Sequence, residues 1–213
     1  MMNTDELITL LANGDARPPA IPTRRILALL AVGILVSFAL MALLLGVRNN
    51  LLQVFALPAF WMKFLFVLAL ACIGWRLAAR LSLPGRRSAA IAALLAAPLA
   101  IIWSIAALSL LQADPLERGE LFWGSTWRVC PFLIAGLSLP IFIAVLRAMR
   151  ELAPTRLRLA GATAGLTAGA TAAAVYCLHC PEMAAPFVGF WYVLGMLIPT
   201  AVGALIGPRV LRW

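Results

Sequence analysis

Six apolar stretches, each long enough to cross a lipid bilayer, alternate with short polar segments along the chain. A helix rises about 1.5 Å per residue, so roughly 20 apolar residues cross the ~30 Å hydrocarbon core of a membrane. The pattern therefore predicts an all-α polytopic membrane protein, a bundle of six transmembrane helices with short loops. The predicted spans are residues 26–46, 59–78, 88–111, 131–146, 157–177 and 186–207. They follow a cytoplasmic N-terminal segment, 1–25, within a transmembrane domain that we place at 26–213.

The composition supports this prediction. Hydrophobic residues make up 64% of the 213 residues, charged residues make up 12%, and the mean hydropathy is +1.00. Soluble domains average about 45–50% apolar and about 25% charged residues. These values exclude an ordinary soluble domain and also a disordered chain, which needs low hydrophobicity and high charge. The first stretch is longer than the roughly 7–15 residues of a signal-peptide core, so we expect it to be retained.

The net charge of +9 has two possible origins, nucleic-acid binding and membrane topology. If the N-terminus is cytoplasmic, thirteen of the 17 basic residues fall on the cytoplasmic side and only Arg48, Arg118 and Arg128 fall outside. Such a bias is the positive-inside signature of membrane proteins. We therefore expect both termini to be cytoplasmic and expect no direct contact with nucleic acid.

One basic residue, Lys63, lies inside the second predicted span, about one helical turn from its outer edge. Its stem is long enough for the ammonium to reach the lipid headgroups. No acidic residue lies within a predicted span, whereas transporters coupled to protons or sodium usually carry one near the midplane. The sequence therefore does not favour ion-coupled transport.

The fifth span carries two stripes of small residues that predict its place in the bundle. Glycines recur every four residues from 161 to 169, and threonines recur every four residues from 163 to 171. At about 100° per residue the two stripes lie on opposite sides of the helix. Small residues allow close backbone approach and threonine hydroxyls can hydrogen-bond across helices, so we expect this helix to be central. In the third span, Pro98 is expected to introduce a kink.

The N-terminal segment has a helical pattern of its own. Asn3 and Glu6 have the spacing of a capping box. An apolar stripe follows, and a proline-rich tether then leads to the first span. The stripe consists of Leu7, Ile8, Leu10 and Leu11. Three interpretations stay open: insertion into a groove on a partner protein, a position flat on the lipid surface, and a frayed tail.

Three of the four cysteines gather on the predicted outer side. Cys130 precedes the fourth span, and Cys177 and Cys180 follow the fifth, whereas Cys72 lies within the second span. This compartment permits disulfides. The sequence leaves open a disulfide, plain packing, and a soft-metal site, for which the candidate ligands are Cys130, Cys177, His179 and Cys180.

The combination of these features resembles a known family. A helix containing Thr4-Asp5-Glu6-Leu7-Ile8 is followed by Leu10-Leu11-Ala12, a proline-rich tether and six spans. Cys-Pro pairs stand at 130–131 and 180–181. In this the chain resembles the NrsF type of membrane anti-sigma factor, a negative regulator of an extracytoplasmic-function sigma factor.

The resemblance implies a protein of the bacterial inner membrane that holds a sigma factor and releases it under envelope, oxidative or metal stress. It makes Leu7, Ile8, Leu10 and Leu11 the expected sigma-binding residues. It also makes Cys130 and Cys180 the expected sensor pair, although the additional Cys177 leaves open which residue partners Cys130.

Two other functions compete with this one. A small-solute or metal transporter would use Lys63 or the outer thiols to contact its substrate. A membrane thiol oxidoreductase needs two communicating cysteine pairs, but only three cysteines lie on the outer side. The sequence contains no HExxH zinc motif, nucleophile elbow or phosphate-binding loop. We therefore expect neither catalytic activity nor a cofactor.

Overall fold

The computed structural model describes residues 3–4, 9, 23–83, 88–152 and 154–212, and within these ranges the chain is helical with no strand. Six of its helices are long and apolar enough to cross a membrane, which confirms the predicted number of long apolar helices. They comprise Arg24–Leu45, Pro58–Leu81, Ala89–Gln112, Cys130–Arg150, Leu157–Tyr176 and Ala185–Val210. Each lies within a few residues of the expected range.

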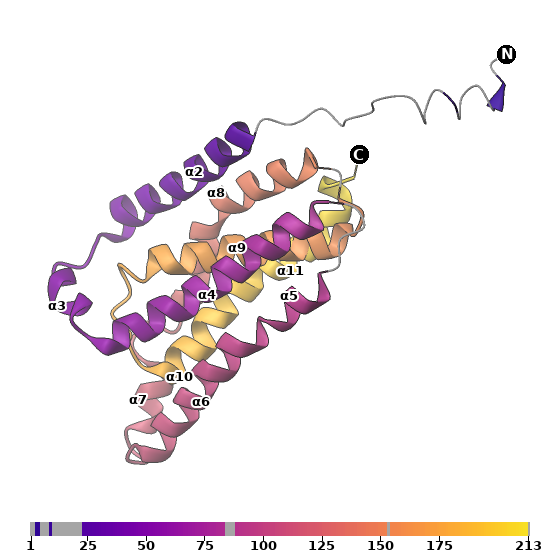
Figure 1. The fold of residues 1–213 in the computed structure, drawn as a ribbon. Helices are drawn as coiled ribbons and strands as arrows, with labels where there is room; N and C mark the ends of the chain where they lie inside the picture. The colour runs from indigo at the N-terminus through magenta and orange to yellow at the C-terminus, as the bar shows by residue number, and fades with distance from the viewer. Residues whose placement is uncertain (1–2, 5–8, 10–22, 84–87, 153, 213) are drawn as a thin grey trace.

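The elements are labelled as in Figure 1. The first three long helices contain α2 (Thr23–Leu40) with the π-helical η1 (Met41–Leu45), α4 (Pro58–Leu81), and α5 (Ala89–Ala93) with α6 (Ala96–Gln112). The last three are α8 (Cys130–Arg150), α9 (Leu157–Tyr176), and α10 (Ala185–Phe187) with the π-helical η2 (Val188–Tyr192) and α11 (Val193–Val210). Two short helices, α3 (Leu51–Phe55) and α7 (Arg118–Trp123), lie in the connections.

The third long helix is interrupted where its proline requires it. Proline lacks an amide hydrogen, and its ring collides with the carbonyl four residues earlier. For Pro98 that carbonyl belongs to Leu94, and the α-helix breaks at Leu94 and Leu95 between α5 and α6. The helix is therefore interrupted at the place where a kink is expected. The π-helical turns η1 and η2 have no such signal in the sequence.

Helix α9 lies at the centre of the bundle, as its two stripes predict. It packs against α4, α8 and α11, and it also touches α2. Figure 1 shows it enclosed by these neighbours. Most of its residues are buried, although its mean hydropathy is the lowest of the six long helices. Its burial therefore follows from the small size of its side chains, which lets other helices approach it closely.

The glycine stripe of α9 forms a backbone-to-backbone contact with α11. A Cβ atom on Gly161 would overlap the carbonyl oxygen of Gly203, and a Cβ atom on Gly165 would overlap that of Pro199. On α11, Gly203 faces the carbonyl of Gly161 in the same way. A main-chain carbonyl cannot rotate aside as a side chain can, so glycine is required at these three positions.

The threonine stripe faces α4, but its hydroxyl groups do not act as expected. Thr167 packs against Gly74, where a Cβ atom would lie 2.9 Å from the threonine hydroxyl oxygen. The hydroxyls of Thr167 and Thr171 each donate to the carbonyl four residues earlier in α9, at 2.7 Å. In the hydrogen bond between the two helices the threonine accepts: Trp75 Nε1 of α4 donates to Thr171 Oγ1 at 3.2 Å. Satisfying the hydroxyl within its own helix leaves the helix surface smooth enough for close packing.

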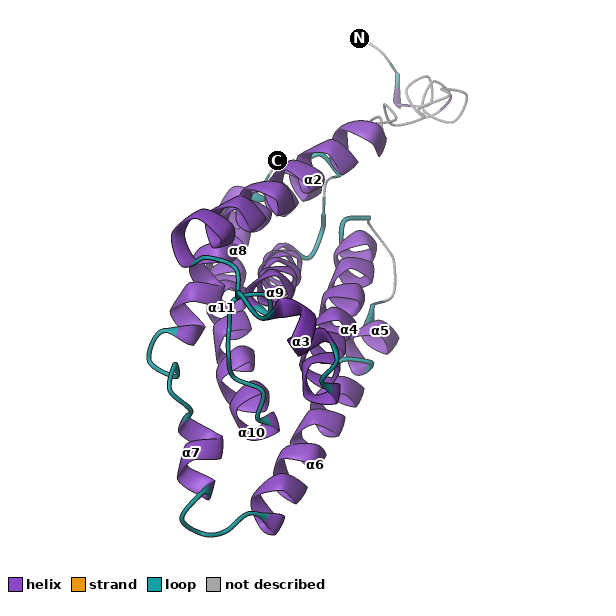
Figure 2. Ribbon diagram, turned by 90° about the vertical axis from the view of Figure 1, so that its left-hand side faces the viewer, coloured by secondary structure: helices purple, strands orange, loops and turns teal. Residues whose placement is uncertain are grey.

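The two ends of the bundle differ in composition. We call the end that contains Cys130, Cys177 and Cys180 the cysteine end; α3, α7 and α10 also lie there, away from the chain termini (Figures 1 and 2). The opposite end is called the arginine end because most described arginines lie there. They are Arg24, Arg25, Arg76, Arg80, Arg147, Arg150, Arg156, Arg158, Arg209 and Arg212. The start of α2 and the end of α11 share this end (Figure 1).

Replacing a glycine of the α9–α11 contact should destabilise the fold. We expect Gly165→Ala to cost about 1–3 kcal/mol, the usual cost of overpacking a closely packed contact. The readout is the temperature at which the detergent-solubilised chain loses its monodisperse chromatographic peak.

Gly136→Ala on α8 is the matched control, because a Cβ atom there meets nothing within 4 Å. Alanine has the higher helix propensity, so this variant should be neutral or slightly stabilised. Equal behaviour of the two variants would contradict the proposed role of the α9–α11 contact.

Candidate functional site

The cysteine end is organised around one short connection, residues 177–184, which we call the Cys-Pro loop. It leaves α9 through a tight turn in which the amides of His179 and Cys180 both donate to the carbonyl of Tyr176 at 3.0 Å. Pro181 then keeps Cys180 non-helical, as expected for a residue before proline. The loop is thereby turned across the end of the bundle toward the other helices.

Lys63 of α4 holds this loop from inside the bundle. Its Nζ donates to the carbonyls of Cys180 at 3.0 Å and Glu182 at 2.9 Å, and it lies 5.7 Å from the centre of the Tyr192 ring. The side chain has an exposed fraction of 0%. The expectation that Lys63 extends outward to lipid headgroups is therefore wrong: the carbonyls of the loop are nearer and satisfy the ammonium within the protein.

The segment after η1 holds the loop from another side. Arg48 Nη1 donates to the carbonyl of Cys180 at 3.3 Å, and the amide of Arg48 donates to Leu178 at 3.3 Å. His179 Nδ1 lies 2.9 Å from the carbonyl of Gly46. Because a carbonyl only accepts hydrogen bonds, Nδ1 carries the proton in this contact. The Cys-Pro loop is thus joined to the first long helix as well as to α4.

Glu182 joins the loop to the segment in front of α8. Its carboxylate accepts from the amide of Ser125 at 2.8 Å, from the Ser125 hydroxyl at 2.7 Å and from the Thr126 hydroxyl at 3.4 Å. Gly124 has φ = 54° and lies against this carboxylate, because a Cβ atom there would come within 2.7 Å of Glu182 Oε2. Thr126 also accepts from the amide of Cys130, so Glu182 and Cys130 are fixed by the same short segment.

The three cysteines of this end are fully buried, and all four cysteines of the chain are free thiols in the structure. Of the three, Cys130 and Cys180 interact directly through their side chains. A hydrogen bond from the Cys130 thiol lowers the pKa of Cys180 below the ordinary value for cysteine, and the Lys63 ammonium lowers it further, against the opposing effect of burial. The structure therefore brings together the two cysteines that the family resemblance pairs.

Cys177 and His179 occupy different positions. Cys177 lies at the end of α9, where its amide continues the helix by donating to Ala173. His179 is turned toward Gly46. No group of three or more His, Cys, Asp or Glu side chains in the described ranges is arranged to hold a metal ion. The predicted ligand set of Cys130, Cys177, His179 and Cys180 stays a prediction.

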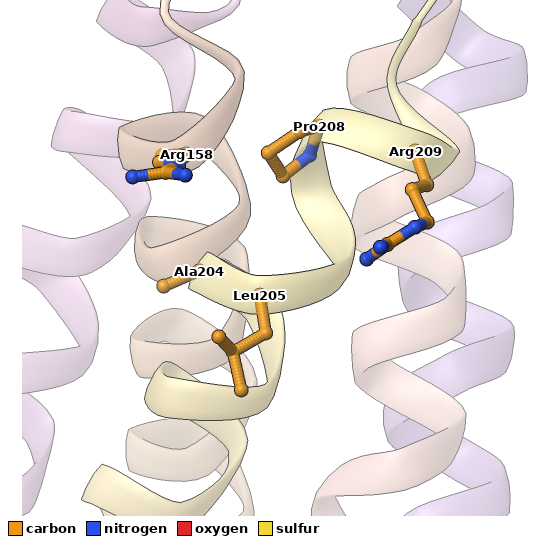
Figure 3. A pocket seen from close by; sticks show the side chains of 5 residues that line it. All are labelled: Arg158, Ala204, Leu205, Pro208 and Arg209. Carbon is orange, nitrogen blue, oxygen red and sulfur yellow. The ribbon is translucent and has the colours of Figure 1, made fainter.

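A second candidate surface lies at the arginine end. A pocket between α9 and α11 is lined by Arg158 and Arg209 together with Ala204, Leu205 and Pro208 (Figure 3). At the same end of the bundle, Arg25 of α2 forms a partly exposed ion pair of 3.7 Å with Glu151 at the end of α8. Such pairs contribute little stability. The surface is basic and lies at the same end of the bundle as the start of α2 (Figure 1).

The predicted sigma-binding residues Leu7, Ile8, Leu10 and Leu11 lie outside the described residues. Sequence reasoning also missed several residues of the site. It placed Lys63 outside the cysteine cluster, and it assigned no role to Arg48 or Tyr192. The available signal was the absence of any acidic residue within the spans, which leaves Lys63 to find an acceptor in the main chain.

Comparison with known proteins matches residues 11–213 to the family model described as "Negative regulator of sigma F", NrsF. The chain belongs to the NrsF family.

Relatives agree with this assignment over their whole length. The "Probable anti-sigma-F factor NrsF" of Azospira oryzae is 52% identical over 214 residues and covers 100% of both chains. The "Anti-sigma-F factor NrsF" of Caulobacter vibrioides is 36% identical over 217 residues, again with 100% coverage of both. No solved structure matches the chain. The resemblance seen in the sequence is thereby confirmed, and NrsF proteins are regulators of transcription, in contrast to the transporter and oxidoreductase alternatives.

The geometry of the site predicts which cysteines pair on oxidation. In the Cys72→Ser, Cys177→Ser variant, mild oxidation with diamide should close a Cys130–Cys180 disulfide, because these two side chains are already in contact. Proteolysis without reductant followed by mass spectrometry identifies the linked peptides.

The control is Cys72→Ser, Cys180→Ser, which keeps Cys130 and Cys177. We expect this variant to form at most a small fraction of the cross-linked product. A Cys130–Cys177 bond of equal yield would contradict the assignment.

Proposed function

We propose that this chain is a membrane-embedded anti-sigma factor that holds an extracytoplasmic-function sigma factor at the bacterial inner membrane and releases it when the thiols at its cysteine end react. The observation that carries the proposal is the full-length similarity to anti-sigma-F factors. Six helices of spanning length and the arginine-rich end support a topology with both termini in the cytoplasm.

In this proposal the N-terminal segment, residues 1–25, captures the sigma factor. Leu7, Ile8, Leu10 and Leu11 form the apolar face of a short amphipathic helix, and such faces dock into hydrophobic grooves. The tether connects that helix to α2 at the arginine end. Anchoring the chain in the membrane keeps the captured sigma factor away from RNA polymerase. The influence on transcription is then indirect and needs no contact between this chain and DNA.

The signal in this proposal is a chemical change of Cys130 and Cys180. Forming a disulfide removes two protons and two electrons, which an oxidant such as a hydroperoxide accepts while it is reduced to an alcohol and water. Binding of a soft metal ion would instead displace the thiol protons. Either reaction alters the distance between the start of α8 and the Cys-Pro loop, the point at which the connections of the bundle meet.

A continuous path of contacts supports transmission to the sigma-binding segment. Cys130 begins α8, and α2 packs along α8, where a Cβ atom on Gly33 would lie 3.0 Å from Ala144 Cβ. Arg25 and Glu151 link the same two helices at the arginine end. A displacement of α8 therefore moves α2, which carries the N-terminal segment. The smooth contact between α9 and α11 allows the neighbouring helices to shift with it.

The sigma-binding face is tested by co-purification. The affinity-tagged chain is extracted in detergent from cells that contain the cognate sigma factor, and the amount retained is measured. Leu11→Glu places a charge in the apolar contact and should weaken binding at least about tenfold, roughly 1.4 kcal/mol. Deletion of residues 1–20 should abolish it.

Thr9→Glu is the matched control, because residue 9 falls on the opposite face of the predicted helix and receives the same charge. It should retain the sigma factor, and all variants should insert into the membrane to the same extent. Undiminished retention by the deletion variant would refute the assignment of sigma binding to this segment.

A further inference from the structure

The pocket between α9 and α11 at the arginine end combines cationic and apolar walls. It has a volume of about 510 Å³. Arg158 is the second residue of α9, and Arg209 lies in the last turn of α11. Figure 3 shows the two arginines on either side of Pro208, with Leu205 further from the chain end. The proposed function assigns no role to these residues.

The main chain holds the two arginines at a fixed spacing. A Cβ atom on Gly207 would lie 2.5 Å from the carbonyl oxygen of Leu157, so the two helix backbones touch at this point. Arg158 directly follows Leu157, and Arg209 stands two residues after Gly207. Because a backbone contact positions both residues, only their side chains have to adjust when a ligand binds. Such pre-organisation lowers the cost of binding.

The positive charge of this pocket has no matching carboxylate among the described residues. Glu151 is the one described acidic residue at the arginine end, and it pairs with Arg25 of α2. The start of α9 adds positive potential, because its N-cap residue Arg156 makes no side-chain bond to the amides of the first turn. Arg209 offsets the negative end of the α11 dipole. The pocket therefore favours an anion.

The apolar wall of the pocket indicates which kind of anion it takes. Leu205 is a large apolar side chain with an exposed fraction of 71%. It precedes Arg209 by one turn of α11, about 5.4 Å further from the arginine end. An anionic phospholipid has the same order of groups, a phosphate followed by acyl chains. A free phosphate would not cover Leu205, and an acidic protein segment would reach the arginines more easily than the deeper leucine.

We propose that this pocket binds an anionic phospholipid: Arg158 and Arg209 bind its phosphate from two helices, and Leu205 contacts the first carbons of an acyl chain. Arginine suits this role because its fork of N–H donors binds phosphate oxygens in pairs. Basic pockets between membrane helices on the cytoplasmic side bind anionic headgroups in this way. The inference rests on the membrane topology of the proposed function and is independent of its thiol chemistry. The bound lipid bridges α9 and α11 where their backbones meet.

The test measures lipid bound to the full detergent-solubilised chain by native mass spectrometry. The probes are dioleoyl phosphatidylglycerol and dioleoyl phosphatidylethanolamine, which share their acyl chains and differ in net charge. The chain should bind phosphatidylglycerol at least about tenfold more tightly. The double variant Arg158→Gln, Arg209→Gln should lose this preference, because the two charges that produce it are gone. Millimolar glycerol phosphate should not displace the lipid, because it has no acyl chain to contact Leu205.

The matched control is the double variant Arg156→Gln, Arg212→Gln. Both side chains are exposed at the same end, stand within three residues of the site arginines and do not line the pocket. This variant loses the same net charge and should keep its preference for phosphatidylglycerol. Equal loss in the two double variants would overturn the proposal, since the preference would then follow net charge alone. Displacement by glycerol phosphate would also overturn it, because the site would then take soluble phosphates.

Two parallel measurements separate this inference from the proposed function. Phosphatidylglycerol should raise the temperature at which the unaltered chain loses its monodisperse peak, and should do so less in the site variant. A site variant that keeps the lipid and loses the sigma factor would make the pocket a surface for an acidic partner and reject the inference. Absence of the lipid preference in a chain that retains the sigma factor rejects the inference alone. Failure to retain the sigma factor in the unaltered chain rejects the proposed function whatever lipid binds.

Discussion

The arrangement of the cysteine end depends on the burial of one lysine ammonium. In an apolar bundle a buried charge must find acceptors, and Lys63 finds them in the carbonyls of Cys180 and Glu182. Those bonds draw the Cys-Pro loop over the end of α4. The loop then lies where Arg48 contacts it from the first helix and where Ser125 contacts it from the segment before α8. One electrostatic requirement thus brings the connections of most of the long helices together.

The bundle below this loop is built for close but smooth contacts. Glycines on α9 and α11 allow their backbones to touch, and the threonine hydroxyls are satisfied within α9. Helix–helix contacts of this kind rely on van der Waals packing. In the proposed function, a change of one bond at the cysteine end is transmitted through this bundle to α2 at the other end.

The sequence predicts the fold well because the patterns involved are local. Long apolar runs locate the six helices, Pro98 locates the break before α6, and the stripes of α9 place it at the centre. Contacts between distant segments were not predictable in this way. The position of Lys63 depends on a loop more than 110 residues later, and the lipid headgroups were a reasonable alternative destination for its ammonium. The contact between Cys130 and Cys180 was expected through family resemblance, whereas the roles of Arg48 and Tyr192 leave no mark on any local pattern.

The proposed function requires that the state of Cys130 and Cys180 controls whether the sigma factor stays bound. Its most direct test uses the Cys72→Ser, Cys177→Ser chain reconstituted in lipid nanodiscs with the sigma factor bound, and measures sigma dissociation before and after the Cys130–Cys180 bond is closed. We expect rapid release on closing the bond, rebinding after reduction, and no response when Cys130 is also replaced by serine. Equal binding of the sigma factor in the closed and reduced states would contradict it.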